Sequence, residues 1–147
     1  MSKNLIACFV FGLSLISVAN CAQRRGNPDA GQAGETEQTI KGEVLVTNRL
    51  DIDFSKHLIT FIELGADRCI PCKAMQPIMK EIAETYADRV QVVFYDVWKD
   101  PEPGRKYGIQ LIPTQVFIDQ KGNEVFRHVG FFPKEEILAL LKKHGVH

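Results

Sequence analysis

The sequence predicts an α/β domain in which helices flank a central mixed β-sheet. Short runs rich in β-branched and aromatic residues alternate along the chain with segments whose apolar residues recur at helical spacing. From residue 39 onward the expected order is β, β, α, β, short α, β, β, α. This order is typical of a mixed sheet with helices packed against it. A Cys-x-x-Cys motif lies at the junction of the second strand and the first helix.

The first two strands are expected at residues 43–47 and 58–64. Both alternating sets of side chains in the second run are mainly apolar, as in a central strand that helices cover on each face. Glu63 is the exception in that run. It is either a carboxyl group held on a covered face or a tolerated charge at the edge of the strand.

After the second strand, the spacing between successive apolar residues changes from two positions to nearly four. Between Pro71 and Tyr86 the apolar residues recur at helical spacing, which predicts a helix that Pro77 should kink. Residues 90–97 predict a third strand, and a short helix is expected to reach Tyr107.

The C-terminal segment predicts a hairpin and a last helix. Residues 114–119 and 124–129 are expected to be strands joined around Gly122. Pro133 fits the first position of the last helix, and Gly145 follows its end.

Composition limits the choice of function. The chain has 147 residues, with 18 Lys and Arg against 18 Asp and Glu. Nucleic acid is not expected as a partner, because phosphate recognition usually needs a basic face. A domain of this size buries a core without disulfide staples. Of the four cysteines, Cys8 and Cys21 lie in or beside the N-terminal apolar segment, which leaves Cys69 and Cys72 as one close pair in the domain. This asymmetry indicates chemistry rather than a structural cross-link. We expect a monomer with no cofactor.

Residues 1–21 are expected to be an export signal. Lys3 gives a positive start, and residues 5–19 form an uncharged, largely apolar run. A membrane-spanning helix needs about 20 such residues, so the shorter run is typical of a signal-peptide core. The protein should therefore be exported, to the periplasm or the cell envelope.

Two processing routes compete at the end of this segment. Cleavage after Ala19 would release a soluble protein, whereas residues 18–21 resemble a bacterial lipobox in which Cys21 is lipidated. Asn20 departs from the usual lipobox residue, but the polar residues 22–38 would suit a flexible linker between an anchor and a domain. We favour lipidation, with the folded domain at residues 39–147.

The segment Cys69-Ile70-Pro71-Cys72 carries the chemistry. Two intervening residues let one helical turn bring the sulfurs within bonding range. Cys69 would lie at the helix N-terminus, where free N–H groups and the helix dipole favour a thiolate. The motif predicts exchange through a mixed disulfide, in which Cys69 attacks and Cys72 resolves. Pro71 restrains the loop and suits the first helical turn.

Two other interpretations of the motif are weaker. A structural zinc site needs four ligands, and the chain has no second close cysteine pair and four scattered histidines. No metal is therefore expected. A purely structural disulfide that closes so short a loop would remove little chain entropy.

The wider pattern around the motif resembles the thioredoxin family over essentially the whole domain. The residues that carry it are the segment 63–73, Pro77, Lys106-Tyr107-Gly108-Ile109, Ile112-Pro113-Thr114, Gly122 and Gly130.

This resemblance implies a thioredoxin fold and several roles. The Ile112–Pro113 bond should be cis, with its loop beside Cys69, where backbone groups pair with an extended substrate strand. Glu63 stands where the family has a buried acid, usually Asp. Burial should raise its pKa and make it the proton acceptor for Cys72.

The chain also departs from the family near the cysteines. Gly65 and Arg68 replace aromatic residues. Arg68 either favours the Cys69 thiolate or is a solvated surface charge. Ile70 replaces the usual glycine, as in exported thioredoxin-like reductases, but the insertion typical of many of those is absent. We expect Arg68, Ile70 and Pro71 to join the substrate loop in binding clients.

The sequence leaves three functions open. A reductase of protein disulfides, supplied by a membrane thiol donor, is preferred because strong oxidants of this fold usually carry His between the cysteines and a helical insertion. The alternatives are a disulfide-donating oxidant and a non-catalytic binding module. Delivery of copper or haem would need a further ligand, for which His128 is the candidate.

Overall fold

A computed structural model describes residues 42–147. The expected signal peptide, the linker and Cys21 lie outside the described residues, as does the start of the expected domain at residue 39. Within residues 42–147, no helix has the length and apolar character needed to cross a membrane.

The helices and strands follow the predicted order. They are β1 (Leu45–Val46), β2 (Ile59–Gly65), α1 (Ile70–Thr85), β3 (Val90–Asp96), α2 (Glu102–Lys106), β4 (Thr114–Asp119), β5 (Glu124–Val129) and α3 (Lys134–Lys143). A short 3-10 turn, η1 (Phe54–Lys56), was not predicted. Strand β1 is shorter than expected, and Pro133 is the N-cap of α3 rather than its first residue. The other boundaries agree closely with the prediction.

The strands form one mixed sheet with the order β1-β3-β2-β4-β5. Strand β3 is parallel to β1 and β2, whereas β4 is antiparallel to both β2 and β5. Strand β2 is central and buried along its whole length. The mixed sheet and the covered central strand that the sequence predicts are thus confirmed.

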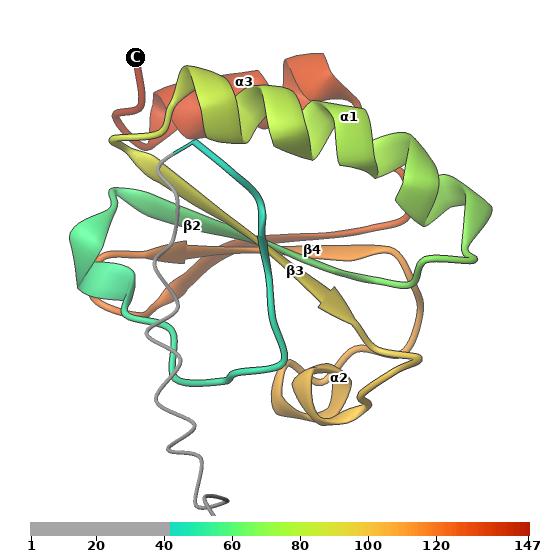
Figure 1. Ribbon diagram of the computed structural model, residues 1–147. Coiled ribbons are helices and arrows are strands. Elements are labelled where there is room, and N and C mark those ends of the chain that lie inside the picture. Colours follow the sequence, from blue (N-terminus) through green and yellow to red (C-terminus); the bar gives the residue numbers. More distant parts are fainter. Residues whose placement is uncertain (1–41) are drawn as a thin grey trace, which may run out of the picture. The chain divides into compact units, whose positions relative to one another are not determined.

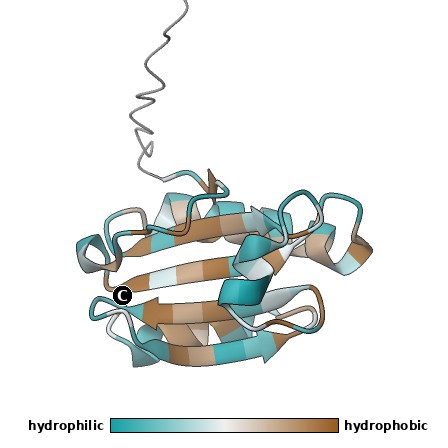
Figure 2. Ribbon diagram, turned by 90° about the horizontal axis from the view of Figure 1, so that it is seen from below, coloured by the Kyte–Doolittle hydropathy of each residue, from teal (hydrophilic) through white to brown (hydrophobic). Residues whose placement is uncertain are grey.

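Helices cover both faces of the sheet. In Figure 1, α1 and α3 lie on one face and α2 on the other. Figure 2 shows apolar residues along the inner strands. The core between the sheet and the helices α1 and α3 is the larger of two layers, and it includes Phe61, Met75, Met79, Phe117, Ile137 and Leu141. The opposite layer includes Ile62, Leu64, Val93, Tyr95 and Val116.

Helix α1 forms because its apolar residues recur every three or four positions. Its buried side chains are Cys72, Met75, Met79, Ile82 and Ala83, which fall on one side of the helix. The helix continues through Pro77, although proline has no N–H to donate. This packing fixes the first turn of α1 against the end of β2, where the Cys-x-x-Cys motif lies.

Candidate active site

The two cysteines of the motif are joined at the N-terminus of α1. Cys69 is the N-cap residue, and Cys72 lies in the first turn. The structure contains the Cys69–Cys72 disulfide, with the two Cα atoms 5.2 Å apart. The backbone N–H of Cys72 donates to Cys69 Sγ at 3.3 Å. Because free N–H groups at a helix start stabilise negative charge, the Cys69 sulfur is in a position that favours a thiolate after reduction.

The two sulfurs differ in access to solvent. Cys69 is 8% exposed, whereas Cys72 is 0% exposed. Cys69 is therefore the more accessible of the two sulfurs, and Cys72 is the less exposed one, as the sequence predicted.

A cis-proline loop lies beside the disulfide. The Ile112–Pro113 bond is cis, and Ile112 packs against the buried cluster of Ala66, Cys69 and Cys72. Gly130 N–H donates to the Pro113 carbonyl at 2.8 Å, which ties the loop to the end of β5. The cis bond and the position of the loop agree with what the resemblance implied.

The residues flanking the disulfide are exposed. Arg68, Ile70 and Pro71 all face solvent, and the Ile70 side chain is 83% exposed although it is apolar. An apolar side chain beside an accessible sulfur can contact a client without first being uncovered.

Asp96 holds the loop that precedes Cys69. Its carboxylate accepts hydrogen bonds from the backbone N–H groups of Asp67, Trp98 and Lys99, and Lys99 pairs with both Asp96 and Asp67. Burial acts to raise the pKa of Asp96, but these hydrogen bonds outweigh it and the pKa is lowered. The loop before the disulfide is therefore anchored to the end of β3.

Glu63 lies inside the sheet, on the face covered by α1. Its side chain is 0% exposed, and Gln115 Nε2 donates to Glu63 Oε2 at 2.9 Å. Burial raises the pKa of Glu63 to about 8, against the lowering effect of the Gln115 hydrogen bond. The structure thus places Glu63 on a covered face, and the alternative of a charge at the edge of the strand is wrong.

Gly65 connects the position of Glu63 with that of Cys72. A Cβ added to Gly65 would lie 3.2 Å from both Cβ and Sγ of Cys72. Since side chains two residues apart on a strand share a face, Glu63 lies on the same face of the sheet as the Cys72 side chain, and along β2 Glu63 is about 7 Å from Gly65. Because Gly65 has no side chain, Cys72 and the edge of the Phe94 ring both pack against its backbone.

Two polar residues of this region were not predicted from the sequence, Gln115 and Asp96. Gln115 could have been noticed as a polar residue within an apolar strand, directly after Pro113-Thr114. Asp96 ends a strand and carries no local signal of the three backbone groups that it binds.

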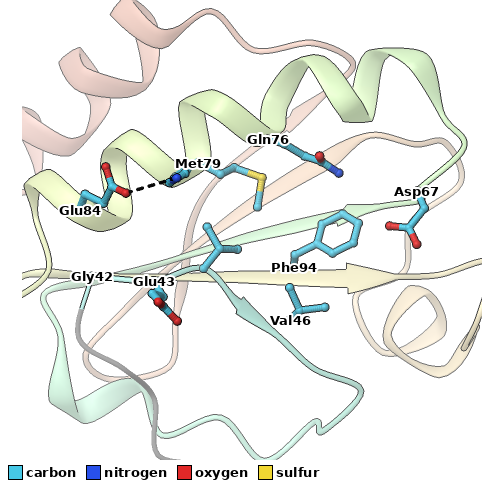
Figure 3. A pocket seen from close by; sticks show the side chains of 10 residues that line it. Gly42, Glu43, Val46, Asp67, Gln76, Met79, Glu84 and Phe94 are labelled. Carbon is cyan, nitrogen blue, oxygen red and sulfur yellow. Dashed lines mark ion pairs between the residues drawn. The ribbon is translucent and has the colours of Figure 1, made fainter.

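A groove lies apart from the disulfide, between α1 and the chain around β1. Figure 3 shows Met79 and Phe94 along it, with Glu43, Asp67 and Glu84 among the residues around it. Neither cysteine lines this groove. The redox centre is therefore at the N-terminal end of α1 and not in this groove.

The described residues contain no metal centre. Among residues 42–147, no group of three or more His, Cys, Asp or Glu side chains is arranged to hold an ion. The ring of His128 stacks on Phe132 with centroids 4.3 Å apart, and its Nε2 is 3.2 Å from the Phe131 carbonyl oxygen.

The fold and this centre define the class of protein. A cysteine pair at a helix N-terminus, with one accessible sulfur beside a cis-proline loop, is the centre of a thiol–disulfide oxidoreductase. The sequence profile described as Thioredoxin matches residues 41–143. The chain belongs to the thioredoxin family.

Individual relatives agree with this assignment. Thioredoxin of Staphylococcus aureus is 32% identical over 97 residues, which make up 64% of this chain and 92% of that protein. Among solved structures, thioredoxin NaTrxh from Nicotiana alata has a TM-score of 0.61 and 31% identity, covering 69% of this chain and 92% of its own. Thioredoxin from Malassezia sympodialis has a TM-score of 0.61 and 26% identity, covering 70% and 91% of the two chains.

Proposed function

We propose that this oxidoreductase reduces the disulfides of protein clients outside the cytoplasm, with Cys69 as the attacking and Cys72 as the resolving thiol. The observation that carries the division of roles is the difference in access: Cys69 is 8% exposed at the helix N-cap and Cys72 is 0% exposed behind it.

The reaction moves two electrons from the dithiol to the client. The Cys69 thiolate attacks one sulfur of the client disulfide, a new S–S bond forms, and the other client sulfur leaves with the electron pair. Cys72 then gives its proton to the Glu63 carboxylate and attacks Cys69 Sγ. The Cys69–Cys72 disulfide forms, and the first client sulfur leaves as a thiolate.

The surface around Cys69 suits an apolar client segment. Ile70 is next to Cys69, and Leu111 and Trp98 are 67% and 62% exposed. Trp98, Leu111 and Ile112 line one shallow hollow beside the cis-proline loop. An extended, apolar client segment could cover these side chains while the loop backbone contacts it.

Single cysteine substitutions test the division of roles. With insulin as the client and dithiothreitol as the electron source, we expect both Cys69→Ser and Cys72→Ser to abolish catalysed reduction. Cys72→Ser should accumulate a mixed disulfide with the client, which Cys69→Ser should not. Accumulation in Cys69→Ser instead would reverse the roles, and unchanged turnover in both variants would refute redox catalysis by this pair.

The equilibrium reduction potential tests the direction. The oxidised and reduced forms of the domain can be equilibrated with glutathione or dithiothreitol and quantified. A value near −270 mV, as in thioredoxin, would support the reductase, whereas a value near −120 mV, as in strong oxidants, would refute it.

The proposed location rests on the N-terminal sequence. Its apolar run and the lipobox-like residues 18–21 support export and lipidation of Cys21, with a membrane thiol protein as electron donor. In a bacterial host, we expect the full chain in the membrane fraction and Cys21→Ser in a soluble fraction outside the cytoplasm. Recovery of the full chain in the cytoplasm would refute export.

A further inference from the structure

Glu63 and Gln115 form a buried polar pair in an otherwise apolar layer. They lie opposite each other on the antiparallel strands β2 and β4, and both side chains are fully buried. Gln115 Nε2 donates to Glu63 Oε2 at 2.9 Å. Glu63 Oε1 and Gln115 Oε1 have no hydrogen-bond partner among the described residues. The amide therefore engages one oxygen of the carboxyl group and leaves the other available.

Apolar groups surround Glu63 on its other sides. Phe94 is its neighbour in register on β3. The stacked rings of Phe61 and Phe117, with centroids 4.7 Å apart, occupy the preceding row of the same face. The following row holds Gly65, where an added Cβ would lie 3.2 Å from Cys72 Sγ and equally close to Phe94 Cε2. Of these two neighbours only Cys72 carries an exchangeable proton, so Cys72 is the candidate proton donor on this side of Glu63.

We propose that Gln115 is a positioning residue for the resolution of the mixed disulfide, holding Glu63 Oε2 so that Oε1 receives the Cys72 proton. This inference rests on the proposed role of Glu63. In the step, the S–H proton of Cys72 passes to Oε1, and the Cys72–Cys69 bond forms. The bond between Cys69 and the client sulfur breaks, and its electron pair leaves on that sulfur.

The amide also controls when the carboxyl group can accept the proton. An N–H donor stabilises a carboxylate more than the neutral acid, so Gln115 opposes the effect of burial on Glu63. Three titratable residues are linked to this part of the sheet by packing or register: Cys72 lies against Gly65, Asp96 pairs with Gly65 on β3, and His128 pairs with Gln115 on β5. The charged side chains of α1 are exposed: Lys73, Lys80, Glu81 and Glu84. Helix α3 buries the apolar side chains of Ile137 and Leu141. Among residues 42–147, the donor of the hydrogen bond to the Glu63 carboxyl group is the neutral side-chain amide of Gln115.

The test separates attack by Cys69 from resolution by Cys72. The reduced protein is mixed with Ellman's reagent, which releases one coloured thiolate when Cys69 attacks and a second when Cys72 resolves. In Gln115→Leu, we expect the pH midpoint of the second release to rise by about one unit, which makes this step about tenfold slower near pH 7. The first release should be unchanged.

Two variants serve as comparison. Gln115→Met also removes the amide, keeps an unbranched side chain and should show the same shift. Gln91→Leu is the matched control, because Gln91 is a half-buried β3 residue whose Oε1 likewise has no partner among the described residues. It should leave the midpoint unchanged. An unchanged midpoint in both Gln115 variants overturns the proposal, even where their thermal stability falls.

Further measurements keep the two proposals distinguishable. If Glu63→Gln leaves the pH profile of the second release unchanged, the proposed role of Glu63 fails. If Glu63→Gln alters the profile but the Gln115 variants do not, this inference alone fails. In the wild type, the side-chain amide signal of Gln115 in NMR spectra should shift with the midpoint of the second release. An amide signal that does not change with pH overturns the inference without any variant.

Discussion

At the scale of single residues, Glu63 is a carboxyl group with no exposure to solvent. Burial raises its pKa from an ordinary value of 4.5 to about 8. Such a pKa lies close to that of a cysteine thiol, so a proton can pass between Glu63 and Cys72 with little change in free energy. A surface carboxylate would be too weak a base for this exchange.

The raised pKa of Glu63 also predicts how stability depends on pH. Between pH 4.5 and about 8 the folded protein binds more protons than the unfolded chain, so the free energy of unfolding should fall as pH rises through this range. We expect Glu63→Gln to remove this dependence. Above pH 8 the variant should be more stable than the wild type by several kcal/mol, on the order of 4.

Urea unfolding of the oxidised proteins at several pH values measures this difference. Glu84→Gln is the control, because Glu84 is an exposed residue of α1 whose Oε1 lies 3.8 Å from Lys80 Nζ. Its unfolding curve should follow that of the wild type. Parallel pH profiles for Glu63→Gln and the wild type would contradict the prediction.

At the scale of elements, the redox centre depends on how β3 and α1 are joined to the loop before Cys69. Asp96 ends β3 and accepts three backbone N–H groups, one of which belongs to Asp67. The disulfide is thus held on one side by α1 and on the other by a carboxylate that binds the preceding loop.

Removing that carboxylate should loosen the loop. We expect Asp96→Ala to lower the free energy of unfolding by about 2 kcal/mol, because it removes the carboxylate that accepts the part-buried hydrogen bonds from Asp67, Trp98 and Lys99. Asp96→Asn, which retains one acceptor oxygen, should lose less. Asp51→Ala is the control, since exposed Asp51 binds Arg49 at the surface and such ion pairs contribute little. Equal losses in Asp96→Ala and Asp51→Ala, measured by urea unfolding, would be evidence against the anchor.

At the scale of the whole molecule, aromatic contacts join the sheet to the segment that leads into α3. Phe117 on β4 stacks on Phe61 with centroids 4.7 Å apart. It also meets Phe126 and Phe132 edge-on, at 6.0 and 6.2 Å. The stack of Phe61 and Phe117 lies in the row next to Glu63 and Gln115, so the core and the buried acid share one layer.

Truncation of Phe117 should therefore affect global stability. We expect Phe117→Ala to lower the free energy of unfolding by about 3–5 kcal/mol, because it leaves a cavity in the core. Phe131→Ala, at a position that is 45% exposed, should cost much less. Denaturant unfolding of the two variants measures the difference, and similar losses would contradict the importance of this contact.

The local pattern of the sequence determined much of the fold and the identity of the redox pair. The spacing of apolar residues over a few positions predicted the order of strands and helices, the covered central strand and the position of Cys69 at the start of α1. This spacing is a local property of the sequence. The cis Ile112–Pro113 bond followed from family resemblance and not from local pattern.

The tertiary structure alone decided which distant groups meet. Gln115 binds Glu63 across 52 positions of sequence, and Asp96 binds the backbone of Asp67 across 29. The physical reason is that strand register and chain crossing set these pairs, and neither leaves a periodic signal in the sequence. Burial of Glu63 could be expected from its strand, but its single amide partner and its relation to Cys72 through Gly65 come from the packed sheet.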